Sequence, residues 1–129
     1  MFPHRLTDTR AFDIARADSA PVIDGMLDDA LWANATLVDD LHQMHPNEHS
    51  AASERTEIRV AYDDDNLYIG AKLWYLNPAE ITANVLRQGE GLGNEDRLAL
   101  ILDPYLDHRS GYRFEVNAHG VRWDALYQN

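Results

Sequence analysis

The chain of 129 residues contains no cysteine. Disulfide bonds and thiolate metal sites are therefore excluded, and cysteine usage gives no indication of the compartment. Long apolar runs are also missing, since no stretch approaches the roughly 20 residues of a membrane-spanning helix. We therefore expect no direct insertion into a membrane. The first 20 residues lack the continuous apolar segment of a signal peptide, which leaves a cytosolic protein or a piece of a longer secreted chain as alternatives.

Basic residues are scarce, with 11 Lys and Arg against 22 Asp and Glu, and the formal net charge is −11. This charge argues against nucleic acids and anionic membrane surfaces as partners, while it permits cation binding or simply high solubility. Catalytic motifs are missing too: the chain has no GxSxG, HExxH or P-loop pattern. Pairs of carboxylates for glycoside hydrolysis cannot be recognised without a fold. We therefore expect no enzymatic activity in this chain.

Residues 55–75, RTEIRVAYDDDNLYIGAKLWY, form the most informative stretch. Residues 56–62 alternate with the period of two that is typical of a half-buried strand. The Asp/Asn run at 63–66 favours a turn, and a second alternating run follows it. In this second run, Tyr68 and Trp74 lie on the face opposite the leucines and isoleucine. The pattern predicts an antiparallel β-hairpin.

Further short elements are expected on both sides of the hairpin. They are an edge strand within 11–17, a helical turn over 28–32, a strand over 37–44, a loop over 45–54, a strand or brief helix over 81–87, a central buried strand over 98–102, and strands over 112–116 and 121–127. Asp28 is the expected N-cap of the helical turn, with Leu27, Leu31 and Trp32 turned inward. Seven or eight short strands predict an all-β fold, an antiparallel β-sandwich of jelly-roll-like type with one short helical turn near Asp28–Trp32.

Three segments, in this order, resemble family 9 carbohydrate-binding modules: residues 23–32 (IDGMLDDALW), 56–69 and 96–120. The resemblance implies a lead-in over 1–20 and a β-sandwich domain over 21–129 that is incomplete at its C-terminus. It also implies sugars held between aromatic rings, often with bound calcium. The closest subgroup lies at the N-terminus of large secreted or outer-membrane-associated bacterial proteins. An extracellular, periplasmic or outer-membrane-associated location within a longer chain is therefore expected.

Two positions depart from this family pattern. Gly93 stands where the family places a stacking tryptophan, and Ala99 stands where it places an acidic sugar contact. The overall match favours a non-catalytic carbohydrate-binding module. The two departures favour an interaction or spacer module that has lost the sugar site, and part of a glycoside hydrolase is a more distant third alternative.

Candidate ligand contacts are aromatic rings together with polar groups that flank the strands of the resemblance. They are Trp74, Tyr68, Arg87, Glu95, Asp96, Arg113 and Asn117. The alternative is structural: Trp74 and Tyr68 pack under a loop or strand, Asp96 and Asn117 stabilise turns, and Arg113 forms a surface ion pair. Trp123 alternates with Val121 and Ala125, and its ring is a further candidate for exposure.

Metal ligands and partners complete the expectations. Asp103 and Asp107 are the candidate ligands of a structural calcium ion, whereas Asp63-Asp64-Asp65 is explained by its turn. His42, His45 and His49 have a spacing that suits zinc only in a helix, so a solvated loop is favoured. The expected partner is an oligo- or polysaccharide, and an exposed edge strand would permit a homodimer.

Overall fold

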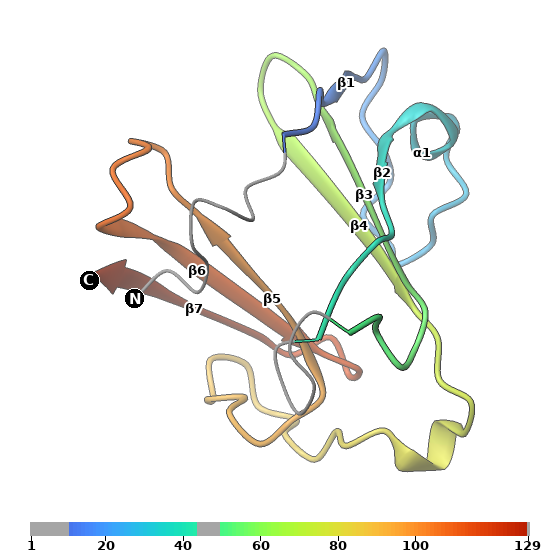
Figure 1. Cartoon of the computed structure of the whole chain (residues 1–129), viewed down its shortest axis with the longest axis vertical. Coiled ribbons are helices and arrows are strands. Elements are labelled where there is room, and N and C mark those ends of the chain that lie inside the picture. Colours follow the sequence, from blue (N-terminus) through green and yellow to red (C-terminus); the bar gives the residue numbers. More distant parts are fainter. Residues whose placement is uncertain (1–10, 44–49, 129) are drawn as a thin grey trace. The chain divides into compact units, whose positions relative to one another are not determined.

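The computed structural model describes residues 11–43 and 50–128, and it confirms the predicted β-rich class (Figure 1). The described residues form two β-sheets, one short α-helix and one 3-10 turn, as expected for a β-sandwich protein. The strands are β1 (Ala15–Arg16), β2 (Thr36–Val38), β3 (Thr56–Tyr62), β4 (Leu67–Leu73), β5 (Arg97–Leu102), β6 (Ser110–Asn117) and β7 (Arg122–Gln128). Two compact units, divided after Leu76, are described separately below.

The N-terminal unit is built on the predicted hairpin. Strands β3 and β4 pair antiparallel along their whole length, from Thr56 opposite Leu73 to Tyr62 opposite Leu67. Asp63 closes the turn, because its Oδ1 accepts the backbone N–H groups of residues 65 and 66, both at 2.8 Å. Strand β2 pairs antiparallel with β3, whereas β1 pairs parallel with it. All other strand pairs are antiparallel, as predicted, and β1 is the exception; a parallel pair needs a long connection, which residues 17–55 between β1 and β3 provide.

The core of this unit lies on one face of the four-stranded sheet. Its buried members are Ala17, Leu31, Trp32, Ala61 and Tyr68, with Leu27 and Ala35 packed against them. The helix α1 spans Ala30–Asn34, and its N-cap position is Asp29, not the predicted Asp28. The Asp29 carboxylate makes no capping bond and instead accepts the N–H of Val22 at 2.8 Å. The inward orientation predicted for Leu27, Leu31 and Trp32 is confirmed.

The predicted strand over 37–44 is shorter than expected. Strand β2 ends at Val38, and the chain pairs again only at an isolated bridge between His42 and Ala51. Met44 and the first half of the predicted loop over 45–54 lie outside the described residues. An acidic pair at positions 39 and 40 separates the two paired segments, and such residues disfavour a continuous strand.

The C-terminal unit contains a three-stranded antiparallel sheet in the order β5-β6-β7. The strand predicted over 112–116 is confirmed within β6, and the strand predicted over 121–127 is confirmed as β7, which begins and ends one residue later. The prediction that 98–102 forms a central, fully buried strand is wrong, because β5 lies at the edge of the described sheet and Leu102 is 36% exposed. A continuous apolar run indicates that both faces of a strand are apolar. It does not indicate whether the strand pairs with neighbours on one side or on both.

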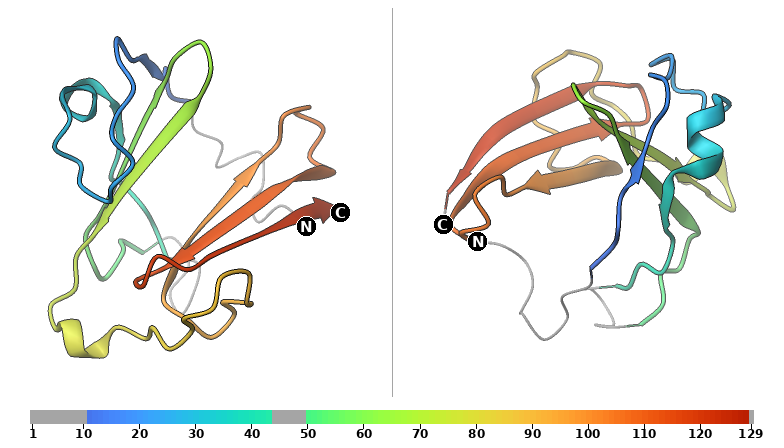
Figure 2. Two further views of the ribbon diagram at one scale, coloured as in Figure 1. Left: turned by 180° about the vertical axis from the view of Figure 1, so that it is seen from behind. Right: turned by 90° about the horizontal axis from the view of Figure 1, so that it is seen from above.

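Residues 77–96 connect the two sheets and contain the 3-10 turn η2 (Pro78–Glu80). Figure 2 shows this connection as the yellow-to-olive segment, with its later part at one end of the three-stranded sheet. The strand or helix predicted over 81–87 is wrong, since these residues form neither. No helix within 11–43 or 50–128 has the length and apolar character needed to cross a membrane.

Candidate functional site

One face of the three-stranded sheet gathers polar and aromatic side chains from all three strands. The antiparallel register places on it Arg97, Ala99 and Ile101 of β5, Gly111, Arg113, Glu115 and Asn117 of β6, and Trp123, Ala125 and Tyr127 of β7. Glu115 is at the centre, directly between Ala99 and Trp123. We refer to Arg97, Arg113, Glu115 and Trp123 as the Trp123 cluster. It joins two cations, one anion and one large aromatic ring.

Glu115 is the most buried charged group of the cluster, with 7% of its surface exposed. A buried carboxylate is costly unless it is paired and hydrogen-bonded. Arg113 donates its Nε–H to Glu115 Oε1 at 3.0 Å, and Arg97 Nε lies 3.1 Å from the same oxygen. Two guanidinium groups therefore fix the orientation of one carboxylate.

The two arginines differ in how many of their donors are already used. Arg97 donates from Nη1 to the carbonyls of Leu92 and Gly93, both at 2.9 Å, so its side chain is held by the preceding loop. Within the described residues, the Nη groups of Arg113 and the Oε2 atom of Glu115 make no hydrogen bond. The side chain of Arg113 is 26% exposed. Arg113 and Glu115 therefore combine a fixed orientation with donors and an acceptor that a ligand can use.

Three other predicted polar residues hold a loop in place. Asp96 Oδ2 accepts the N–H of Thr82 at 2.7 Å, and Glu95 accepts the N–H groups of residues 84 and 85. Asn117, which is 6% exposed, donates to the carbonyl of Val85 at 3.0 Å. The structure thus brings Glu95, Asp96 and Asn117 together around residues 82–85, where they stabilise the loop. For Asp96 and Asn117, this is the structural alternative to ligand contact given in the sequence analysis.

Arg87 follows this loop and is exposed, and only its backbone carbonyl has a hydrogen bond within the described residues, from Glu90 N at 3.3 Å. Arg87 is not one of the residues that the strand register brings to the face of the Trp123 cluster. A ligand contact by any of these four residues stays a prediction.

The two aromatic residues predicted for the hairpin do not form a surface pair. Tyr68 is 8% exposed, belongs to the core, and donates its hydroxyl to Asp63 Oδ2 at 2.6 Å. Trp74 is half-buried, and the guanidinium of Arg55 and the ammonium of Lys72 lie 4.4 and 5.1 Å from its ring centre. Cations at this distance are attracted to the ring face that a sugar would need.

The sequence pattern could have ranked Trp123 higher among the candidate ligand contacts. Its alternation with Val121 and Ala125 shows which side chains share a face. Only the β6–β7 register shows that this face also carries Glu115 and Arg113. Arg97 gave no signal of its own, because it precedes the apolar run and resembles an ordinary solvated strand end.

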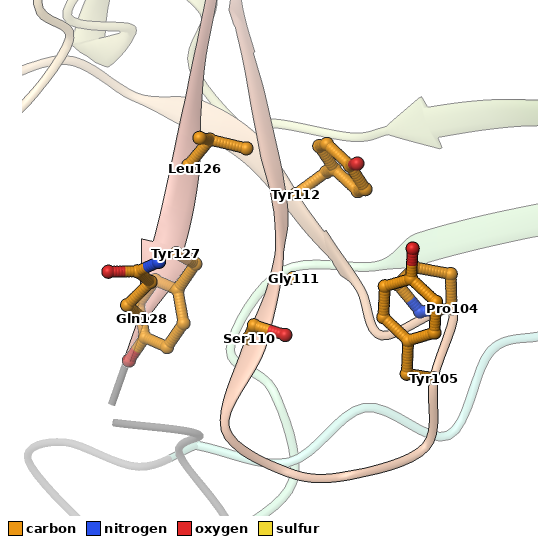
Figure 3. A pocket seen from close by; sticks show the side chains of 8 residues that line it. All are labelled: Pro104, Tyr105, Ser110, Gly111, Tyr112, Leu126, Tyr127 and Gln128. Atoms are coloured by element: carbon orange, nitrogen blue, oxygen red, sulfur yellow. The ribbon is translucent and has the colours of Figure 1, made fainter.

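A small pocket lies at the other end of the three-stranded sheet (Figure 3). Its lining residues are Pro104, Tyr105, Ser110, Gly111, Tyr112, Leu126, Tyr127 and Gln128. Gly111 is required there, because a Cβ atom would lie 2.5 Å from the carbonyl oxygen of Leu102. The sequence did not predict this pocket, since its residues come from both faces of the sheet and from the loop after β5.

The two predicted calcium ligands cap turns in the loop between β5 and β6. Asp103 accepts the N–H groups of Asp107 and His108 at 3.3 and 2.9 Å. Asp107 accepts those of Arg109 and Ser110 at 2.9 and 3.1 Å, and these bonds lower the pKa of its carboxyl group. The carboxylates are thus already used as acceptors and do not by themselves form a calcium site.

No group of three or more histidine, aspartate or glutamate side chains in the described part of the chain is placed to hold a metal ion. The calcium ion stays a prediction. Of the three histidines considered for zinc, His45 and His49 lie outside the described residues.

A tryptophan, two arginines and a carboxylate on one face of a small sheet are groups that can bind a small polar ligand, which places the chain in the class of small β-sheet proteins with a candidate binding face. The family comparison agrees with this class. The family described as "Carbohydrate family 9 binding domain-like" matches residues 23–126, and the chain belongs to this family. The search of curated proteins and the search of solved structures found no match.

Proposed function

We propose that this chain is a carbohydrate-binding module that holds an oligo- or polysaccharide on the Trp123 cluster. In this proposal it is a non-catalytic part of a larger extracellular or envelope protein. Its membership of the family supports binding of a carbohydrate. The assignment to this face depends on one observation: Trp123 lies directly opposite Glu115. Arg113 is the neighbouring residue of β6 on the same face, two positions before Glu115.

The chemistry of the cluster suits a pyranose ring. A sugar ring has an apolar face that stacks on an aromatic side chain, and hydroxyl groups that need both donors and acceptors. Trp123 supplies the ring, Arg113 supplies Nη donors, and Glu115 supplies the Oε2 acceptor. Charge-assisted hydrogen bonds of this kind are stronger than neutral ones. Arg97 is a positioning residue, since it holds Glu115 and is itself held by the loop carbonyls.

The register also accounts for one of the two departures from the family pattern. Ala99 lies directly opposite Glu115 across the β5–β6 pair, so their Cβ atoms are separated by about 5 Å. A carboxylate missing at position 99 is therefore supplied from the neighbouring strand on the same face. Gly93 has no such substitute in the register, which leaves the cluster with a single tryptophan.

The proposal predicts that Trp123→Ala weakens sugar binding about tenfold or more, because the stacking surface is lost. The measurement is isothermal titration calorimetry with glucose, cellobiose, xylobiose and soluble xylan. Trp74→Ala is the matched control, and it is expected to bind as the wild-type chain does. The assignment to the Trp123 cluster is overturned if Trp74→Ala loses binding and Trp123→Ala retains it.

The second candidate function is a protein-interaction or spacer module that has lost the sugar site. Gly93 is the observation that favours it, since one ring without a facing partner binds a sugar more weakly than two. A folded wild-type chain that shows no heat of binding with any of the four sugars would give this function the lead.

A further inference from the structure

The side chains that the register places on the face of the Trp123 cluster carry a positive net charge although the chain is acidic, and the carboxylates of Glu95 and Asp96 lie beyond the Asn117 end of this face. Of the residues that the register places on this face, only Arg97, Arg113 and Glu115 are charged at neutral pH. Two guanidinium groups and one carboxylate give +2 − 1 = +1. The whole chain has a formal charge of −11. A surplus cation on the same face as an aromatic ring suits a ligand that carries negative charge.

Arg113 supplies the excess charge in a form that a carboxylate can use. Its Nε is held by Glu115 Oε1 at 3.0 Å, so the planar guanidinium has one orientation. Its two Nη groups make no hydrogen bond within the described residues, and its side chain is 26% exposed. Two parallel N–H donors at the end of a guanidinium match the two oxygens of a carboxylate. Arg97 offers less, because its Nη1 is already used by Leu92 and Gly93.

We propose that the preferred ligand of the Trp123 cluster is an acidic sugar, an oligosaccharide that contains a uronic acid. The pyranose ring stacks on Trp123, and the uronate carboxylate accepts hydrogen bonds from the Nη groups of Arg113. Glu115 accepts a sugar hydroxyl and holds Arg113 in place. This inference rests on the proposed function, which requires only that some carbohydrate binds here.

The first test compares two probes that differ only in the acidic group: xylotriose substituted with glucuronic acid, and the same oligosaccharide with the carboxyl group reduced to the alcohol, which is a glucosyl substituent. Isothermal titration calorimetry of the intact chain is expected to give about tenfold tighter binding of the acidic probe at low salt. An increase from about 50 to about 500 mM NaCl is expected to weaken binding of the acidic probe and to leave binding of the neutral probe unchanged. This comparison needs no variant, so it does not depend on the folding of one.

The second test uses Arg113→Gln, with Arg122→Gln as the matched control. Both variants make the same change in net charge, but Arg122 is exposed on the opposite face of β7. Arg113→Gln is expected to bind both probes equally, and Arg122→Gln is expected to keep the preference. Equal binding of both probes by the wild-type chain overturns the acidic preference and leaves the proposed function standing. No binding of either probe overturns both, and a preference that survives in Arg113→Gln overturns the assignment to Arg113.

Discussion

At the scale of single residues, a glycine decides how closely the four-stranded sheet approaches its helix. A Cβ atom on Gly70 would lie 2.8 Å from Leu27 Cδ2 and 3.0 Å from Trp32 Cζ3. Both neighbours belong to the core of the N-terminal unit, so neither can move without disturbing other contacts. The indole N–H of Trp32 has no hydrogen-bond partner in the described structure, and its ring is held there by packing alone.

Gly70→Ala is therefore expected to lower the free energy of unfolding by about 1–3 kcal/mol, the usual cost of overpacking a core. Urea denaturation monitored by circular dichroism measures this change. Gly91→Ala is the control, because a Cβ at Gly91 meets no atom within 4 Å. It is expected to change stability by less than about 0.5 kcal/mol. Equal effects of the two substitutions would contradict the packing described for Gly70.

Asp63 makes the hairpin turn sensitive to acid. Its pKa is lowered from the ordinary value of 3.8, chiefly by the hydrogen bond from the Tyr68 hydroxyl and also by the N–H groups of residues 65 and 66. A lowered pKa in the folded state means that the ionised carboxylate stabilises the fold above pH 3.8 and loses this effect as the pH falls through the folded-state value.

We expect Asp63→Asn to be less stable than the wild-type chain at neutral pH, and the difference to shrink as the pH falls below 3.8. Chemical denaturation at a series of pH values measures this. Asp65→Asn is the control for the loss of one charge, because it changes an exposed position in the same turn and leaves the hydrogen bonds of the Asp63 carboxylate in place. A gap between Asp63→Asn and wild type that is the same at pH 7 and in strong acid would show that the carboxylate charge is not involved.

At the scale of secondary-structure elements, local chemistry explains which predictions succeeded. The hairpin was predictable because its alternation and its Asp-rich turn lie within one continuous stretch. The conformation of the segment 81–87 was not predictable, because its hydrogen-bond partners are distant in the sequence. Some of its backbone N–H groups bind side chains 10 to 14 residues away, and one of its carbonyls binds a side chain 32 residues away. No periodicity within the segment records these partners. The apolar run at 98–102 was identified as a strand, but its place at the edge depends on tertiary pairing.

The candidate site was predictable only in part for the same reason. Arg113 was identified, and so was the alternation of Trp123. The link between them depends on a register in which Arg113 lies opposite Ala125, and Glu115 opposite Trp123. A shift of one residue would move every one of these side chains to the other face. A single sequence does not fix that register.

Substitution of Asn117 tests how the loop over 82–88 is fixed to the sheet. Asn117→Ala removes the bond to the Val85 carbonyl and the two bonds that its Oδ1 accepts from the N–H groups of His119 and Val121, all at 3.0 Å. Because these groups are partly or fully buried, the loss is expected to cost about 1–3 kcal/mol. Hydrogen exchange should become faster at the Val121 amide. Asn94→Ala, at an exposed turn position, is the control that should leave both quantities unchanged.

At the scale of the whole molecule, the net charge of −11 opposes the folded state by self-repulsion. An increase in NaCl from about 10 to about 150 mM shortens the Debye length from about 30 to about 8 Å. We expect the midpoint of thermal unfolding to rise by a few degrees over this range. KCl should have the same effect, because screening depends on ionic strength. A fall in the midpoint would indicate that ion pairs such as those of Glu115 outweigh the general repulsion.

The edge position of β5 has a consequence during synthesis and refolding. The segment LALIL at 98–102 is apolar and uncharged, and it contains neither proline nor glycine, which is the composition of sequences that assemble into intermolecular cross-β structure. Arg97 precedes it, and Asp103 and Pro104 follow it, so both ends carry gatekeeper residues that oppose such assembly. Arg97 therefore protects the unfolded chain as well as orienting Glu115 in the folded one. Substitutions at Arg97 should lower the yield of soluble protein through aggregation, separately from any effect on ligand affinity.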